Sequence, residues 1–147
     1  MIAANSSVSY EPILDTMIQM TFARRSHRVI AAGSAASALY RGLWRRGFSR
    51  VTTAAYSRAR GTPHEIALVA GEESLQALEA LMIRLVVLLS DQAHVAAWID
   101  SADPQRGRRL QSLLERLEFR VESGAKCEIG FVLAARRYER KALVLFA

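Results

Sequence analysis

Cysteine, lysine and proline are scarce among the 147 residues, and the shortage of cysteine excludes the most. The single cysteine, Cys127, rules out an internal disulfide and a cysteine-based zinc site, and it fits a reducing, cytoplasmic setting. The three histidines, His27, His64 and His94, lack the spacing of metal ligands, and each lies near a predicted loop. We therefore expect no metal, and we interpret the histidines as surface or turn residues.

Long hydrophobic segments are also missing. The first ten residues are polar and lack the basic-then-apolar order of a secretory signal. The longest apolar run, residues 81–89, is interrupted by Arg84 and is too short to span a bilayer. The sequence therefore predicts no association with a membrane.

The charge is basic and comes almost entirely from arginine. The formal net charge is +6, and Lys126 and Lys141 are the only lysines. Binding to an anionic partner such as nucleic acid would explain this balance, and so would arginine-favouring codon usage. The scatter of arginines along the chain favours codon usage. The arginines that would carry nucleic-acid binding are Arg24, Arg25, Arg28, Arg45, Arg46, Arg58 and Arg60.

The composition, with 51% hydrophobic and 23% charged residues, is that of a folded protein with one domain. Behind a loose tail (residues 1–9) and a helix (10–23), strand-like runs alternate with helical patterns over residues 28–137, which indicates an α/β fold with a mostly parallel sheet. The expected strands are residues 28–32, 50–56, 65–70, 95–99, 118–122 and 128–135. The expected helices are residues 37–46, 74–89 and 104–117, with turns at 92–94 and 123–126.

The turn at Gly33 and Ser34 is the most informative local pattern. An apolar strand meets this turn and a helix follows at once, which is typical of the first unit of a nucleotide-binding α/β domain. Such a turn directs backbone N–H groups and the positive end of the helix toward a ligand. Gly33 and Ser34 are therefore candidate binding residues, while a lone glycine is also ordinary turn chemistry.

The end of the chain carries a family resemblance. Residues 113–121, Leu-Leu-Glu-Arg-Leu-Glu-Phe-Arg-Val, resemble the Leu-Leu-Glu-x-x-Gly-Phe-x-Val turn of the class I S-adenosylmethionine-dependent methyltransferases, with Glu118 at the glycine. The resemblance covers residues 28–137 in the order of elements. It implies a three-layer Rossmann-like sandwich whose mostly parallel sheet is closed by a C-terminal antiparallel hairpin. It also implies S-adenosylmethionine as the cofactor.

The same resemblance implies where the cofactor would bind, namely around Gly33, Ser34, Tyr56 and Glu72. Glu72 follows a strand end, and the alternative interpretation is a favourable charge in the first turn of a helix. The sequence departs from the family at two points. The first strand ends with one glycine and no acid, and the second ends Ala54-Ala55 where the family has a ribose-binding acid. The stretch between Tyr56 and Glu65 is too short for a further helix-and-strand unit, so one such unit is missing.

Three functions follow from these features. The first is a methyltransferase-like protein that uses S-adenosylmethionine. The second is a non-catalytic Rossmann-like interaction or assembly module, expected as a homodimer. An arginine-rich nucleic-acid-associated protein ranks third, because no nucleic-acid-binding motif accompanies the arginines. No nucleophile with a neighbouring base identifies a catalytic residue.

Overall fold

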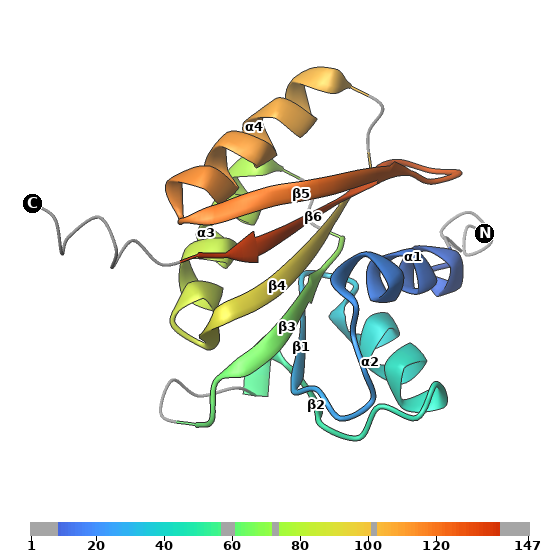
Figure 1. Cartoon of the computed structure of the whole chain (residues 1–147). Coiled ribbons are helices and arrows are strands. Elements are labelled where there is room, and N and C mark those ends of the chain that lie inside the picture. The colour runs from blue at the N-terminus through green and yellow to red at the C-terminus, as the bar shows by residue number, and fades with distance from the viewer. Residues whose placement is uncertain (1–8, 57–60, 72–73, 101–102, 139–147) are drawn as a thin grey trace, which may run out of the picture.

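The computed structural model describes residues 9–56, 61–71, 74–100 and 103–138. Within these ranges the chain forms one six-stranded sheet in the order β2-β1-β3-β4-β6-β5, flanked by four helices (Figure 1). The elements are α1 (Glu11–Thr21), β1 (Val29–Ala32), α2 (Ala36–Arg45), β2 (Val51–Thr53), the 3-10 helix η2 (Ala54–Tyr56), β3 (His64–Val69), α3 (Leu75–Val86), β4 (Leu89–Ile99), α4 (Pro104–Arg116), β5 (Phe119–Lys126) and β6 (Phe131–Arg137).

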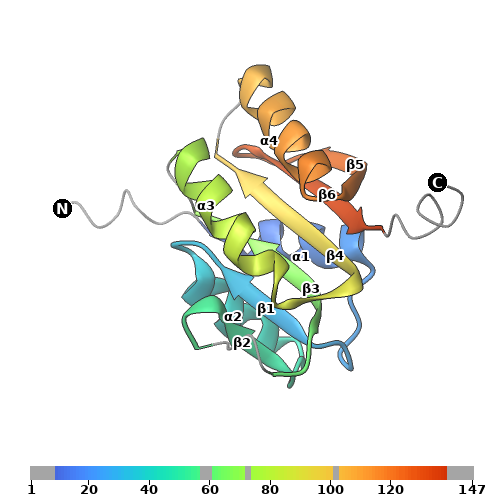
Figure 2. The same cartoon turned by 90° about the vertical axis from the view of Figure 1, so that its left-hand side faces the viewer.

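The helices form two layers, one on each face of the sheet (Figures 1 and 2). Leu14 of α1 and Leu39 of α2 pack on one face, against strand residues such as Ile66. Met82 of α3 and Leu114 of α4 pack on the opposite face. The predicted three-layer sandwich is thereby confirmed.

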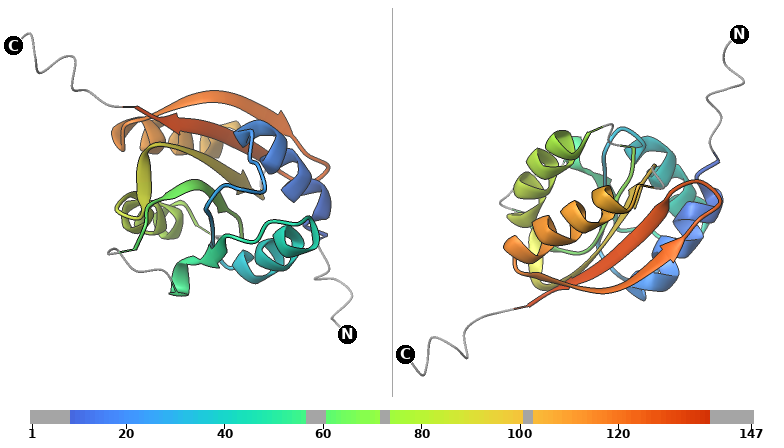
Figure 3. Two further views of the ribbon diagram at one scale, coloured as in Figure 1. Left: turned by 60° about the horizontal axis from the view of Figure 1, so that its bottom comes forward. Right: turned by 90° about the horizontal axis from the view of Figure 1, so that it is seen from above.

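The strand directions confirm the second part of the fold prediction. Strands β2, β1, β3 and β4 are parallel, and β6 and β5 pair antiparallel at the C-terminal end of the chain. All four residues of β1 are buried, as in a central strand with helices on both faces. The strand β2 forms one edge of the sheet and β5 forms the other (Figure 3).

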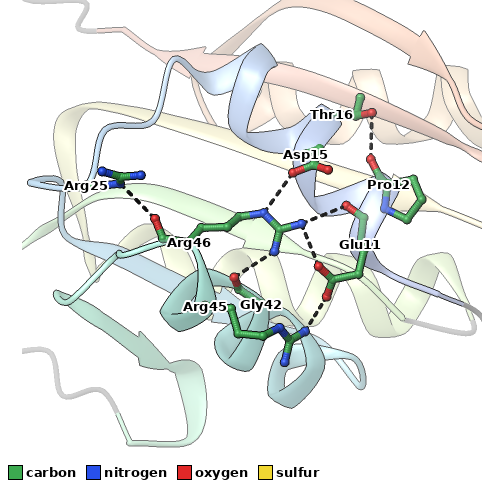
Figure 4. Close-up of polar contacts among 8 residues, drawn as sticks. All are labelled: Glu11, Pro12, Asp15, Thr16, Arg25, Gly42, Arg45 and Arg46. Atoms are coloured by element: carbon green, nitrogen blue, oxygen red, sulfur yellow. Dashed lines mark hydrogen bonds and ion pairs between the residues drawn. The ribbon is translucent and has the colours of Figure 1, made fainter.

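An ion-pair network joins α1 to α2 (Figure 4). Arg46 contacts Asp15 at 2.9 Å and Glu11 at 2.8 Å, and Arg45 contacts Glu11 at 2.5 Å. The two helices approach closely at Gly42, where a Cβ would lie 2.5 Å from Cδ2 of Leu14. Three of the basic side chains that sequence alone offered for nucleic acid are thus bound internally, since Arg25 also donates to the carbonyl of Arg46 at 2.9 Å.

The boundary between α3 and β4 was predicted wrongly. The helix ends at Val86 rather than at residue 89, and β4 begins at Leu89 and runs through the expected turn at 92–94. Arg137 stabilises this boundary, because its guanidinium donates to the carbonyls of Val86 and Leu89 at 3.1 and 3.0 Å. The pairing of β4 with β6 begins at His94, the last residue of the expected turn, opposite Arg136.

The predicted turn of the C-terminal hairpin is also displaced. Residues 123–126 belong to β5, and the chain reverses over residues 127–130. Gly130 has φ +73°, and its carbonyl accepts the N–H of Cys127 at 2.9 Å. The expected second strand is shorter than predicted, because Ala54–Tyr56 forms a 3-10 helix. Among the described helices, none combines the length and the apolar character needed to cross a membrane.

Candidate functional site

The first part of the candidate site is the turn between β1 and α2. Gly33 has φ +96°, a left-handed backbone conformation that favours glycine. A Cβ at this position would lie 2.1 Å from the carbonyl oxygen of Ala70, so the close approach of the segment after β3 also demands glycine. The next turn residue, Ser34, donates its hydroxyl to the carbonyl of Gly71.

The segment after β3 forms the other side of the site. Gly71 has φ +96°, and a Cβ there would lie 2.6 Å from the backbone nitrogen of Ala35. The N–H of Ala35 donates to the carbonyl of Ala70, and the N–H of Ala70 donates to that of Ala32, each at 3.1 Å. The two turns therefore touch backbone to backbone. Neither glycine therefore leaves room for a side chain.

A hollow of about 610 Å³ lies beside this contact, on the face of the sheet that carries α3. Gly33 and Ser34 line it together with Ala54 and Ala55 of η2. Its other wall comes from α3 and the turn after it, through Leu81, Arg84, Leu85 and Leu88. The hollow is thus mostly apolar, and among the described lining residues the only charged side chain is that of Arg84.

Of the four residues proposed for cofactor binding, the structure brings two together in one hollow. Gly33 and Ser34 lie together at the carboxyl edge of the sheet and share the hollow. Tyr56 is described only as the last residue of η2, directly after Ala54 and Ala55. Glu72 lies outside the described residues. The first two are therefore brought together with the end of β2, where alanines stand in place of an acid.

An aromatic pair lies near the carboxyl end of β4. Trp98 is 5% exposed, and its ring meets that of Tyr10 edge to face with centroids 5.6 Å apart. The indole N–H donates to the carbonyl of Ile129 at 2.9 Å. Burial, and then the charge of Asp100, raise the pKa of the Tyr10 phenol. Because the indole N–H is satisfied and the ring is covered, this pair joins α1 to the sheet.

Two of the three histidines, His64 and His94, lie in strands and not in the loops or turns that the sequence predicted. His64 is 7% exposed at the start of β3, and His94 lies within β4. Burial lowers the pKa of both imidazoles. His27 is in a turn as predicted, with its Nδ1 accepting the N–H of Arg24 at 2.8 Å. Across the described ranges, no three side chains of the histidine, cysteine and acidic types gather as metal ligands would.

Cys127 is half-buried, and burial raises the pKa of its thiol. A raised pKa keeps the sulfur protonated and poorly nucleophilic near neutral pH.

Comparison with known proteins shows which structures share this fold. No protein-family model and no curated protein match the sequence. Solved structures do match: an S-adenosylmethionine-dependent O-methyltransferase from Thermotoga maritima aligns with a TM-score of 0.60 at 13% identity, over 91% of this chain and 68% of that one. The precorrin-6y C5,15-methyltransferase from Geobacter metallireducens gives a TM-score of 0.57 at 12% identity, over 86% and 88% of the two chains.

A third match was solved with S-adenosylhomocysteine bound. It is the 1,6-didemethyltoxoflavin-N1-methyltransferase from Burkholderia thailandensis, with a TM-score of 0.59 at 14% identity over 93% of this chain and 82% of that one. The chain therefore has the Rossmann-like fold of the class I S-adenosylmethionine-dependent methyltransferases, as the resemblance predicted.

The crevice differs from the site that the resemblance implies. The close approach of Gly33 to the carbonyl of Ala70 joins the two turns on one side of the hollow. A carboxylate that would bind ribose hydroxyls is missing at the end of β2, where Ala54 and Ala55 stand. The fold is that of a methyltransferase, and at its crevice the two turns contact each other beside an open hollow.

Proposed function

We propose that this chain is a non-catalytic protein with a methyltransferase fold, which acts as an interaction or assembly module. The observation that carries the proposal is the contact between the two turns. The hydroxyl of Ser34 and the N–H of Ala35 donate across the crevice to the carbonyls of Gly71 and Ala70. A cofactor tail lying between these turns would have to break both bonds, at a cost of about 1 kcal/mol each.

The end of β2 supports the same proposal. A ribose offers two neighbouring hydroxyls, and binding them strongly calls for a charged acceptor. The side chains of Ala54 and Ala55 present methyl groups to the hollow instead. The ligand chemistry of this surface is therefore apolar, which suits a protein partner better than a nucleoside.

Binding of S-adenosylmethionine is the second candidate function. One observation favours it: the hollow of about 610 Å³ opens beside Gly33 and Ser34, at the edge where the fold's cofactor would be held. On this alternative Gly33, Ser34, Tyr56 and Glu72 contribute to the cofactor site. Nucleic-acid binding stays third, because Arg25, Arg45 and Arg46 already bind the carbonyl or carboxylates of α1 and α2.

Isothermal titration calorimetry of the full chain with S-adenosylmethionine and with S-adenosylhomocysteine tests the proposal. We expect no heat of binding from a sample that circular dichroism shows to be folded, while an active methyltransferase run beside it gives a normal isotherm. Saturable binding that is lost on Ala55→Arg, a substitution that places a long side chain in the hollow, would overturn the proposal. The second candidate function would then stand.

A further inference from the structure

The two edges of the sheet differ in how they are protected. β5 carries the exposed charges of Arg120, Glu122 and Lys126, and a bulge interrupts its pairing between Val121 and Ser123. Charges and bulges on an edge strand discourage the addition of a further strand. β2, Val51-Thr52-Thr53, has neither: its residues are uncharged and half-buried, and its pairing with β1 is regular.

The outer edge of β2 presents backbone groups that a further strand could bind. The carbonyl of Arg50 accepts the N–H of Val29 at 2.9 Å, so Arg50 and Thr52 direct their backbone groups toward β1. Alternate residues of a strand face opposite edges, and Val51 and Thr53 therefore direct theirs outward. Among the described segments, β1 is the only strand that pairs with β2.

One hollow flanks β2 on the α2 face of the sheet, and another lies beyond the carboxyl end of β2, beside Ala54 and Ala55. The hollow of about 610 Å³ lies on the α3 face and is lined by Ala54, Leu85 and Leu88 among others. A second hollow of about 500 Å³ lies on the α2 face, where Tyr40 and Thr53 help to line it. A strand added to β2 would point alternate side chains to the two faces of the sheet, so the hollow on the α2 face would receive every second side chain.

Among the described residues, the charged side chains that line these two hollows are arginines. Arg41 lines the hollow on the α2 face, Arg84 lines the one on the α3 face, and Arg50 directly precedes β2. All three side chains are exposed, and none of them is in an ion pair with another described residue. A second copy pairing edge to edge would bring these arginines together, which disfavours self-association at this site.

We propose that β2 is a docking edge for an extended acidic peptide segment of a partner protein. The segment adds a strand beside β2, forms backbone hydrogen bonds with Val51 and Thr53, and places every second side chain in the hollow on the α2 face. Its acidic residues lie near Arg41 and Arg84. This inference rests on the proposed function, because it gives the interaction module its surface and the chemistry of its partner.

The test uses nitrogen-15-labelled full-length protein and a soluble synthetic peptide that alternates valine and threonine between terminal aspartates. We expect saturable shifts in the amide signals of Val51 and Thr53, together with slower hydrogen exchange at both. The amides of β5 serve as an internal reference and should not change. A matched peptide, N-methylated at the amides that would face β2, should not bind, because its backbone cannot donate.

Charge reversal provides a second readout. In Arg41→Glu/Arg84→Glu, affinity for the aspartate peptide should fall by about tenfold, and a lysine-flanked peptide should become the better ligand. The matched control is Arg108→Glu/Arg109→Glu, which makes the same charge change on α4, where both side chains line a different hollow. This control should bind the aspartate peptide nearly as wild type does, because its substitutions are far from β2.

Three outcomes would overturn the inference: no response at Val51 and Thr53, equal binding of the N-methylated peptide, or an equal effect of the two charge reversals. Protection of both amides in the free protein, with a dimer by light scattering, would identify a second copy as the occupant and also overturn it. Heat with S-adenosylmethionine would contradict the proposed function instead, so the two failures are distinguishable.

Discussion

The α-carbon of Gly33 lies against the carbonyl oxygen of Ala70, and a Cβ there would stand 2.1 Å from that oxygen. Replacing Gly33 with alanine should therefore lower the free energy of unfolding by about 2–4 kcal/mol, since it adds a backbone clash to the cost of a positive φ. Urea unfolding followed by circular dichroism measures the loss.

Gly47 is the matched control for this substitution. Its φ of +91° resembles the +96° of Gly33, but a Cβ there would meet the side chain of Arg25, with the nearest atom, Nε, at 3.0 Å. Since that side chain can move, at the cost of its exposed hydrogen bond to the carbonyl of Arg46, Gly47→Ala should cost about 1–2 kcal/mol. Equal losses for the two variants would contradict the close contact between the turns.

Glu118 has φ +69° at the position where the resemblance expects glycine. Left-handed backbone costs a non-glycine residue roughly 1–2 kcal/mol, so Glu118→Gly should raise the free energy of unfolding by about 1 kcal/mol. Glu115→Gly, placed inside α4, should lower it by about 1 kcal/mol. Thermal unfolding of both variants beside wild type tests the pair, and a loss of stability in Glu118→Gly would contradict the expectation.

The ion pairs between α1 and α2 predict that the stability of the fold falls at acidic pH. Hydrogen bonds from Arg45 and Arg46 lower the pKa of Glu11 below its ordinary 4.5. A carboxylate whose folded pKa is lowered contributes stability above its unfolded pKa and loses that contribution as the pH falls through the folded value. The melting temperature of wild type should therefore fall more steeply below about pH 5 than that of Glu11→Gln.

Salt should reduce this difference, because the side chain of Glu11 is 46% exposed and screening weakens exposed pairs. Melting curves at low and high salt provide the control. An acid dependence that is the same in wild type and Glu11→Gln would show that the network contributes nothing measurable.

The burial of His64 and His94 predicts a second pH dependence of stability, nearer neutral pH. Burial lowers the pKa of both imidazoles below the ordinary 6.5, so the folded protein favours their neutral forms. Stability from these groups is complete above the unfolded pKa and is lost as the pH falls through the lowered values. Nuclear magnetic resonance titration should place both midpoints below 6.5, and a midpoint at or above that value would contradict the burial of the ring.

The class of fold was predictable from sequence because it depends on local patterns. The apolar strand before Gly33 and the cap and proline at Asp103-Pro104 are each readable within a few residues, and Asp103 does accept the N–H of Gln105 at 3.0 Å. The α3–β4 boundary was not predictable in this way. Its position depends on Arg137, which is 51 residues away from Val86 in the chain.

The candidate site was predictable only in part. Sequence placed Gly33 and Ser34 at the edge of the sheet, because a glycine after an apolar strand indicates a turn there. The bonds from Ser34 to Gly71 and from Ala35 to Ala70 join segments far apart in the chain, and no local pattern encodes them. The placement of Trp98 against Tyr10 depends in the same way on how α1 lies on the sheet.

The contact of Arg137 with the end of α3 also bears on the order in which the chain can fold during synthesis. Arg137 is the last residue of β6, yet its guanidinium completes the turn between α3 and β4 by donating to the carbonyls of Val86 and Leu89. The second edge of β4 also stays unpaired until β6 is available. A ribosome-bound chain that has not yet exposed Arg137 therefore carries an unfinished central strand, and the sheet closes only when β6 has emerged.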